Sequence, residues 1–185
     1  STLLLASCQT HKNPGLSETD WRLDSLKSQI SFISTKNQTI AESHTMAFQH
    51  GEITNLSEVE LILNLNSVDT QIEIRDQRLK NLLFETEKYP TAIITSTLPE
   101  TLTLGKTTEI NLLLNLHGHK KSISARVVAQ LVEGELVVTN FDPITVHAKT
   151  SYIIFLTQMN KKVQFFDSEL FFRIYSVPVD PNPSE

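Results

Sequence analysis

The chain has 185 residues, of which 39% are hydrophobic and 20% are charged, and its formal net charge is −5. This length favours one domain with a core large enough to need no disulfide or metal. Proteins that bind nucleic acid carry a basic face, so the acidic balance and the lack of a basic run predict no nucleic-acid partner. Solubility alone accounts for the mild acidity.

The chain opens with an apolar run that ends at its only cysteine. In STLLLASCQT, the residues before Cys8 are similar to the bacterial lipobox read by lipoprotein signal peptidase. The resemblance implies cleavage before Cys8, acylation of its sulfur and a membrane anchor, with Gln9 favouring the outer membrane over inner-membrane retention. The alternative is that residues 1–6 are simply an apolar tail. A single cysteine also excludes an internal disulfide and a multi-thiolate metal site.

Residues 9–18 are polar and contain Pro14 and Gly15, which is typical of a tether. We therefore divide the chain into a signal remnant with lipobox and tether over residues 1–18, a folded domain over residues 19–179, and a tail over residues 180–185. No other segment approaches the roughly 20 consecutive apolar residues that a membrane-spanning helix needs.

From Trp21 onward, apolar and polar residues alternate in short runs, which is typical of half-buried strands. The clearest run is 58–66, where the apolar residues all fall on one face. Similar runs occur at 30–32, 46–48, 110–116 and 123–131, and the last clear strand signals are Leu136, Val138 and residues 145–147. We interpret four glycines as turns between runs: Gly51, Gly105, Gly118 and Gly134. About eight strands at regular intervals predict an antiparallel sandwich or barrel.

Two segments depart from the strand pattern. Residues 77–85 place Leu79, Leu82 and Leu83 at helical spacing, and Asp76 is suited to cap the N-terminus of this helix. Residues 151–166 are rich in large apolar side chains without strict alternation, and we expect a second helix there. The tail VDPNPSE should be extended or disordered.

Ten short segments follow one another along the chain in a characteristic order. They are Trp21-Arg22-Leu23-Asp24, Ser28-x-Ile30-x-Phe32, Ser67-Val68-Asp69-Thr70, Arg75-Asp76, Leu82-Leu83-Phe84, Tyr89-Pro90, Ala92-x-Ile94-x-Ser96, Leu114 to Lys120, Phe141-Asp142-Pro143-Ile144 and Val177-Pro178-Val179. Their order and spacing resemble the YceI-like family, the lipid- or polyisoprenoid-binding proteins of bacteria. The family continues past the last segment into a closing strand, whereas Asp180 and Pro181 end the pattern here.

The resemblance implies an all-β fold, an eight-stranded antiparallel lipocalin-like barrel with one or two short helices, whose pore holds an isoprenoid chain. A barrel of this size can either fill itself with side chains or hold one slender ligand. Our candidates for the apolar lining are Phe32, Phe48, Leu61, Leu63, Leu65, Ile94, Leu112 and Leu114. Ordinary core packing also accounts for each of them, because the inward face of a barrel is both core and lining.

Arg75 is the candidate contact for a quinone or phosphate head group at the mouth of the barrel. The competing interpretation is a structural ion pair with Asp76, which we favour for Asp76 itself. Asp69 and Thr70 are better suited to fix the turn than to bind a ligand.

His117 and His119 are two residues apart, so on a strand they would share a face and could begin a metal site. A third ligand would have to come from distant residues such as His44, His50 or His147. We prefer polar turn residues, and we expect no metal and no cofactor. The chain also lacks the GxSxG, P-loop, HExxH and GxGxxG motifs, so no catalytic residue is assigned.

Taken together, these features predict a non-catalytic periplasmic protein that sequesters or carries an amphiphilic isoprenoid, a quinone or a polyprenyl compound, and is anchored through Cys8. The alternative is a structural or interaction module whose barrel is filled by its own side chains. The sequence leaves the oligomeric state open, a homodimer included.

Overall fold

The computed structural model describes residues 19–36, 40–55, 57–146 and 168–180. Within these ranges the strands are β1 (Trp21–Leu23), β2 (Gln29–Lys36), β3 (Ile40–Thr54), β4 (Glu58–Asp69), β5 (Thr91–Thr97), β6 (Thr107–Leu116), β7 (His119–Val132), β8 (Glu135–Asn140), β9 (Ile144–Val146) and β10 (Ser168–Pro178). One helical segment, α1 (Glu73–Arg78) continued by η2 (Leu79–Phe84), lies between β4 and β5.

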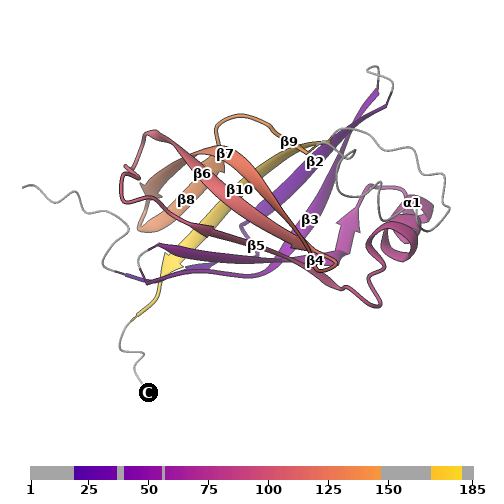
Figure 1. Cartoon of the computed structure of the whole chain (residues 1–185), viewed down its shortest axis with the longest axis horizontal. Coiled ribbons are helices and arrows are strands. Elements are labelled where there is room, and N and C mark those ends of the chain that lie inside the picture. The colour runs from indigo at the N-terminus through magenta and orange to yellow at the C-terminus, as the bar shows by residue number, and fades with distance from the viewer. Residues whose placement is uncertain (1–18, 37–39, 56, 147–167, 181–185) are drawn as a thin grey trace, which may run out of the picture.

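Eight of these strands form a closed antiparallel barrel, which confirms the predicted fold class. The strands follow the order β10-β2-β3-β4-β5-β6-β7-β8, and pairing between β8 and β10 closes the ring (Figure 1). The short strands β1 and β9 also pair with β10, β1 near its end and β9 near its start. Closure leaves each of the eight strands with a neighbour on both sides, so the barrel presents no long unpaired edge.

The sequence pattern does not predict the strand that closes the barrel, because its last clear strand signals end near residue 147. In the structure β10 runs from Ser168 to Pro178 and pairs with both β2 and β8. Its inward residues Phe172 and Ile174 alternate with Phe171 and Tyr175. Because large apolar or aromatic side chains stand on both faces, the period of two is hidden in the sequence.

The predicted turn at Gly51 is wrong, because Gly51 lies inside β3 and pairs with Leu61 of β4. A Cβ atom at this position would lie 2.7 Å from Leu61 Cδ2 and 3.0 Å from Leu23 Cβ. The glycine therefore allows the side chains of β1 and β4 to approach the backbone of β3 closely. Gly105, Gly118 and Gly134 do lie in turns, with positive φ values that suit glycine.

The helix predicted over residues 77–85 exists, but it begins at Glu73, and Asp76 does not cap it. The residue at the N-terminal boundary is Ile72, whose side chain makes no capping hydrogen bond. The second half of the segment is π-helical. Because a π-helix has roughly 4.4 residues per turn, residues four and five positions after Leu79 both return to its face. Leu83 and Phe84 therefore both turn towards the barrel, where they pack with Leu79 against its core.

Several predictions concern residues outside the described ranges. These are the acylation of Cys8, the tether over residues 9–18, the helix over residues 151–166, a role for His147, and most of the tail. In the described part of the chain, no helix has both the length and the apolar character that crossing a bilayer requires.

Candidate ligand-binding cavity

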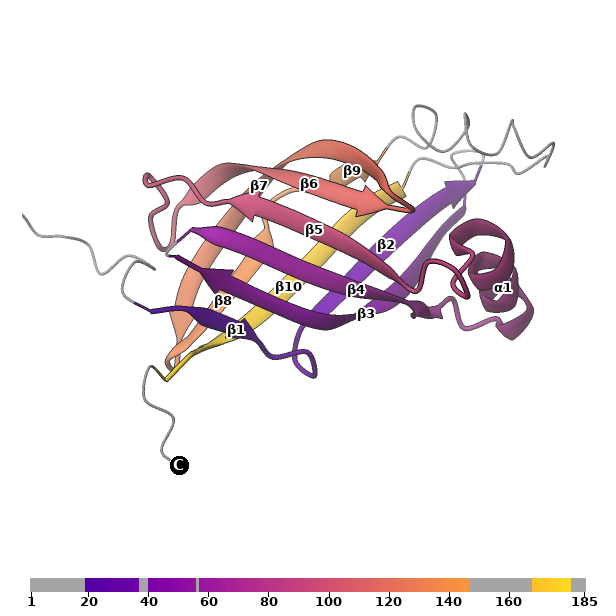
Figure 2. The same ribbon diagram turned by 60° about the horizontal axis from the view of Figure 1, so that its bottom comes forward.

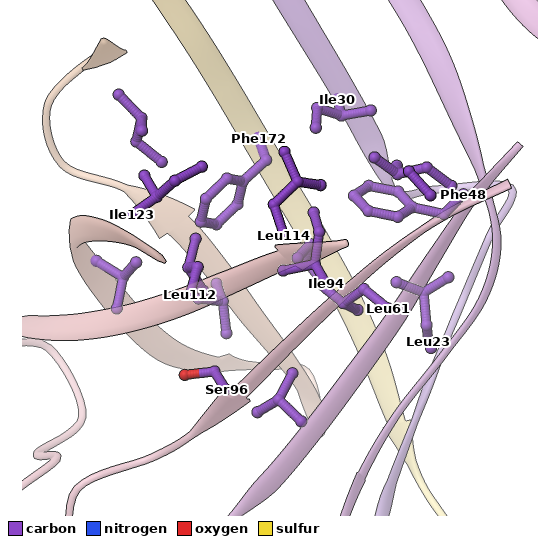
Figure 3. Close-up of a pocket in the computed structure, with 18 of the residues that line it drawn as sticks. Leu23, Ile30, Phe48, Leu61, Ile94, Ser96, Leu112, Leu114, Ile123 and Phe172 are labelled. Atoms are coloured by element: carbon purple, nitrogen blue, oxygen red, sulfur yellow. The ribbon is translucent and has the colours of Figure 1, made fainter. Parts of the chain in front are cut away.

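The barrel contains a cavity of about 310 Å³. Side chains from all eight barrel strands line it, together with Leu83 and Phe84 of η2. Figure 3 shows the apolar side chains of β2, β4, β5, β6 and β10 gathered around this space, with Ser96 as the one labelled polar residue. The wall is thus almost wholly hydrocarbon.

The few polar residues of the wall offer little to an incoming polar group. Ser96 Oγ donates a hydrogen bond to the carbonyl of Asn111, 2.8 Å away. The Glu52 side chain is 45% exposed and its carboxylate lies 3.7 Å from His50 Nε2. Ser176 is buried. A charged or strongly polar ligand group would lose its hydration here without compensating partners, so the interior suits an apolar chain.

All eight residues predicted to line the pore do line this cavity. They are Phe32 of β2, Phe48 of β3, Leu61, Leu63 and Leu65 of β4, Ile94 of β5, and Leu112 and Leu114 of β6. Phe48, Leu61, Leu63 and Leu65 are also buried members of the main core cluster. The same side chains therefore serve as core and as wall, and their contact with a ligand stays a prediction.

Sequence reasoning missed the parts of the wall that come from segments without a clear alternating pattern. Leu83 and Phe84 come from the π-helical turn, and Phe172 comes from the hidden strand β10. Leu98 and Leu102 come from the connection between β5 and β6. The connection is otherwise polar and contains a proline, and its three leucines, Leu98, Leu102 and Leu104, were the one signal that could have marked this segment as packed.

The size of the cavity sets the length of chain that it can hold. An engineered apolar cavity of about 150 Å³ accommodates benzene, which corresponds to roughly 25 Å³ per carbon atom. On that scale 310 Å³ holds about a dozen carbon atoms, or between two and three isoprene units. A longer chain would fill the cavity and extend beyond it.

The two ends of the cavity differ. At one end lie the β5–β6 connection and a second apolar cluster that includes Trp21, Ile53 and Leu136. At the opposite end, α1 and η2 stand beside the barrel (Figure 2). Leu83, Phe84 and Leu116 line the cavity there. One end is therefore a packed apolar floor, and the other is bordered by the helical segment.

Arg75 lies at the helical end but is not part of the cavity wall. Its Nε donates to the Thr70 hydroxyl at 2.9 Å, and its Nη2 donates to the Thr70 carbonyl at 3.0 Å. These two bonds brace the start of the helix against the end of β4. A contact between Arg75 and a ligand head group stays a prediction.

Asp76 binds the same threonine. Its Oδ1 accepts the Thr70 backbone N–H at 2.9 Å and the Thr70 hydroxyl at 2.5 Å. The hydroxyl bond is the main cause that lowers the pKa of Asp76, with smaller contributions from the backbone bond, Lys80 and Arg75. Thr70 is itself buried, so Asp76 satisfies polar groups that water cannot reach. This geometry is consistent with the structural role that the sequence favours for Asp76. The partner of Asp76 is however Thr70, and Asp76 does not occupy the N-cap position of the helix.

His117 holds the tip of the β6–β7 hairpin against the helical segment. His117 and Gly118 both have positive φ values, as a two-residue turn between antiparallel strands requires. The His117 Nε2 donates to the Phe84 carbonyl at 2.5 Å, and its ring stacks on Tyr89 with centroids 4.5 Å apart. Burial lowers the pKa of His117. No three His, Cys, Asp or Glu residues gather into a metal site among the residues that the structure describes.

Comparison with known proteins agrees with this architecture. The model of the YceI-like domain matches residues 21–169. A polyisoprenoid-binding domain from Saccharophagus degradans, implicated in plant cell wall breakdown, superposes with a TM-score of 0.71 at 25% identity, covering 88% of this chain and 100% of that domain. BcnA of Burkholderia cenocepacia superposes with a TM-score of 0.59 at 12% identity, covering 83% and 98%, and shows the fold alone. No curated protein matches the chain.

Proposed function

Because the chain belongs to the YceI-like domain family, we propose that it binds an amphiphilic isoprenoid lipid, a quinone or a polyprenyl compound, with the tail inside the barrel. The observation that carries the proposal is the closed barrel around an apolar cavity of about 310 Å³. Binding is not followed by chemistry: the protein sequesters or transports the lipid.

Two further observations support this ligand class. The structural neighbour from Saccharophagus degradans is described as a polyisoprenoid-binding domain. Affinity for an apolar chain should also rise with its length, since each CH₂ group buried against the cavity wall contributes about 0.8 kcal/mol. Each isoprene unit that still fits should therefore strengthen binding by roughly 4 kcal/mol before ordering costs are subtracted.

The tail enters towards the apolar floor, and the head group stays at the helical end beside α1. The floor supports this orientation, because a polar head group buried there would lose its water without gaining partners. Arg75, which donates hydrogen bonds to Thr70 at the helical end, is our candidate to hold the head group. YceI-like proteins are periplasmic, and we place this chain in the periplasm with an anchor at Cys8.

The test is to purify the chain from bacterial cells in its folded state, extract it, and identify bound lipids by mass spectrometry. We expect a prenyl compound in near-stoichiometric amount, and affinity for added prenyl alcohols that rises with chain length. A folded barrel with no lipid, and with no gain in affinity along the series, would instead support a module filled by its own side chains.

A Thr70→Val variant tests the brace and the head group separately from the tail. It removes the hydroxyl that Arg75 and Asp76 share but leaves the cavity wall unchanged. Prenyl hydrocarbons without a head group should bind this variant as they bind the wild type. Compounds with a head group should bind it more weakly, and equal losses for both would exclude a head-group site beside Arg75.

A further inference from the structure

The floor of the cavity is built by the connection between β5 and β6, residues 98–106. Leu98 and Leu102 of this connection line the cavity and pack with the cluster formed by Trp21, Ile53, Ala129 and Leu136. The connection lies at the end of the barrel opposite α1 (Figure 2). The two leucines therefore stand where the far end of a bound chain would stop.

Backbone hydrogen bonds fix this connection at both of its ends. The N–H of Leu98 donates to the Ser57 carbonyl at 2.8 Å, and the N–H of Gly105 donates to the Ala129 carbonyl at 2.7 Å. Within the connection, the N–H of Leu102 donates to the Pro99 carbonyl at 2.9 Å. The positions of Leu98 and Leu102 thus follow from the barrel frame, and the floor resists displacement by a ligand.

We propose that Leu98 and Leu102 are specificity-determining residues that set the length of the isoprenoid chain held inside the barrel. The proposal rests on the proposed function and deepens it. A chain that meets a fixed apolar floor can bury carbons only up to that point, and further isoprene units must remain beyond the helical end. Affinity rises with chain length while added units are buried and levels off once they are not.

The size of the effect follows from the side-chain volumes. A leucine-to-alanine change removes about three carbon atoms, or roughly 75 Å³ on the scale used for the cavity. The double variant Leu98→Ala/Leu102→Ala therefore opens room for about one more isoprene unit. Leu102→Trp adds about six non-hydrogen atoms at the floor and should shorten the buried segment by about one unit.

The experiment compares wild type, the double alanine variant, Leu102→Trp and Leu104→Ala as purified proteins. Leu104→Ala is the matched control, because Leu104 lies in the same connection and packs on the same cluster but does not line the cavity. Each protein is titrated with prenyl alcohols that lengthen by one isoprene unit, and the length at which affinity stops rising is recorded. Bound lipids are identified in parallel by mass spectrometry.

We expect this length to increase by one unit in the double variant, to decrease by one unit in Leu102→Trp, and to stay unchanged in Leu104→Ala. Equal profiles in all folded variants would overturn the floor while leaving lipid binding intact. If the double variant does not fold, Leu102→Trp decides alone, since an unchanged profile there refutes the proposal. A wild type that binds no prenyl compound would overturn both this inference and the proposed function.

Discussion

Replacing Leu63 by tryptophan separates a hollow, ligand-binding barrel from a barrel that is filled by its own side chains. Leu63 lies in the middle of β4, is 4% exposed, and lines the cavity. Tryptophan adds about six non-hydrogen atoms, or roughly 150 Å³ on the benzene scale, which is about half of the space available. A hollow barrel should admit the ring into that space, whereas a filled barrel must distort to accept it.

The two cases differ in which measured quantity changes. In a hollow barrel the variant displaces about six carbons of ligand, and at about 0.8 kcal/mol each this weakens binding by roughly 5 kcal/mol, more than a thousandfold. The free energy of unfolding of the lipid-free protein should change by less than about 1 kcal/mol. In a filled barrel, overpacking should lower that free energy by about 1–3 kcal/mol.

The assay combines displacement of a fluorescent prenyl compound with urea denaturation of the lipid-free protein. Ile62→Trp is the matched control, because Ile62 is the neighbouring residue of β4 and is not part of the cavity wall. It should bind ligand as the wild type does. The reasoning is refuted if Leu63→Trp binds ligand with unchanged affinity and is destabilised by several kcal/mol.

Three further predictions concern stability. Leu136→Ala should lower the free energy of unfolding by about 2–5 kcal/mol, because Leu136 is fully buried outside the cavity wall. Leu112→Ala should lower it by less, because Leu112 already borders the cavity, and urea denaturation of the lipid-free proteins measures both changes. Asp76→Asn should flatten the loss of thermal stability in acid. The hydrogen bond from Thr70 lowers the pKa of Asp76 from 3.8, so the contribution of Asp76 to folding stability is present above pH 3.8 and is lost as the pH falls through the lower folded-state pKa. Equal acid sensitivity of the variant and the wild type would contradict this. His117→Gln should reduce the dependence of Tm on pH below about 6.5. Burial lowers the pKa of His117, so the unfolded state binds the proton more readily, and the wild type loses stability as the pH decreases from about 6.5 to the folded-state pKa. An unchanged slope of Tm against pH would exclude this role.

The alternating pattern together with the family resemblance was sufficient to predict the barrel and part of its wall. In β4, residues 59, 61, 63 and 65 alternate with polar or outward residues, and a period of two fixes which face turns inward. In a closed barrel, the side chains on the inward face of every strand point into the same interior space. All eight predicted lining residues could therefore be read from local pattern and the family resemblance, without knowledge of the strand order.

The pattern failed where one local signal had two structural solutions. Gly51 suits a turn and equally suits a strand position where Leu61 and Leu23 crowd the backbone, and only the packed neighbours distinguish the two. Asp76 precedes a good helical pattern, but its carboxylate binds Thr70, which holds the start of the helix four residues earlier than expected. Neither competing partner is visible from spacing along the chain.

The sequence by itself determined the strand periodicity, the inward apolar face and the absence of an obvious catalytic motif, because these depend on neighbours along the chain. Only the tertiary structure decided how the barrel closes through β10, which end of the cavity the β5–β6 connection seals, and that Arg75 bonds to Thr70. These features depend on contacts between residues far apart in sequence, such as Leu98 with Ser57 and Ser176 with Leu136, and no local pattern encodes such pairings. The cavity is a property of the closed ring, and it arises only when the last strand meets the others.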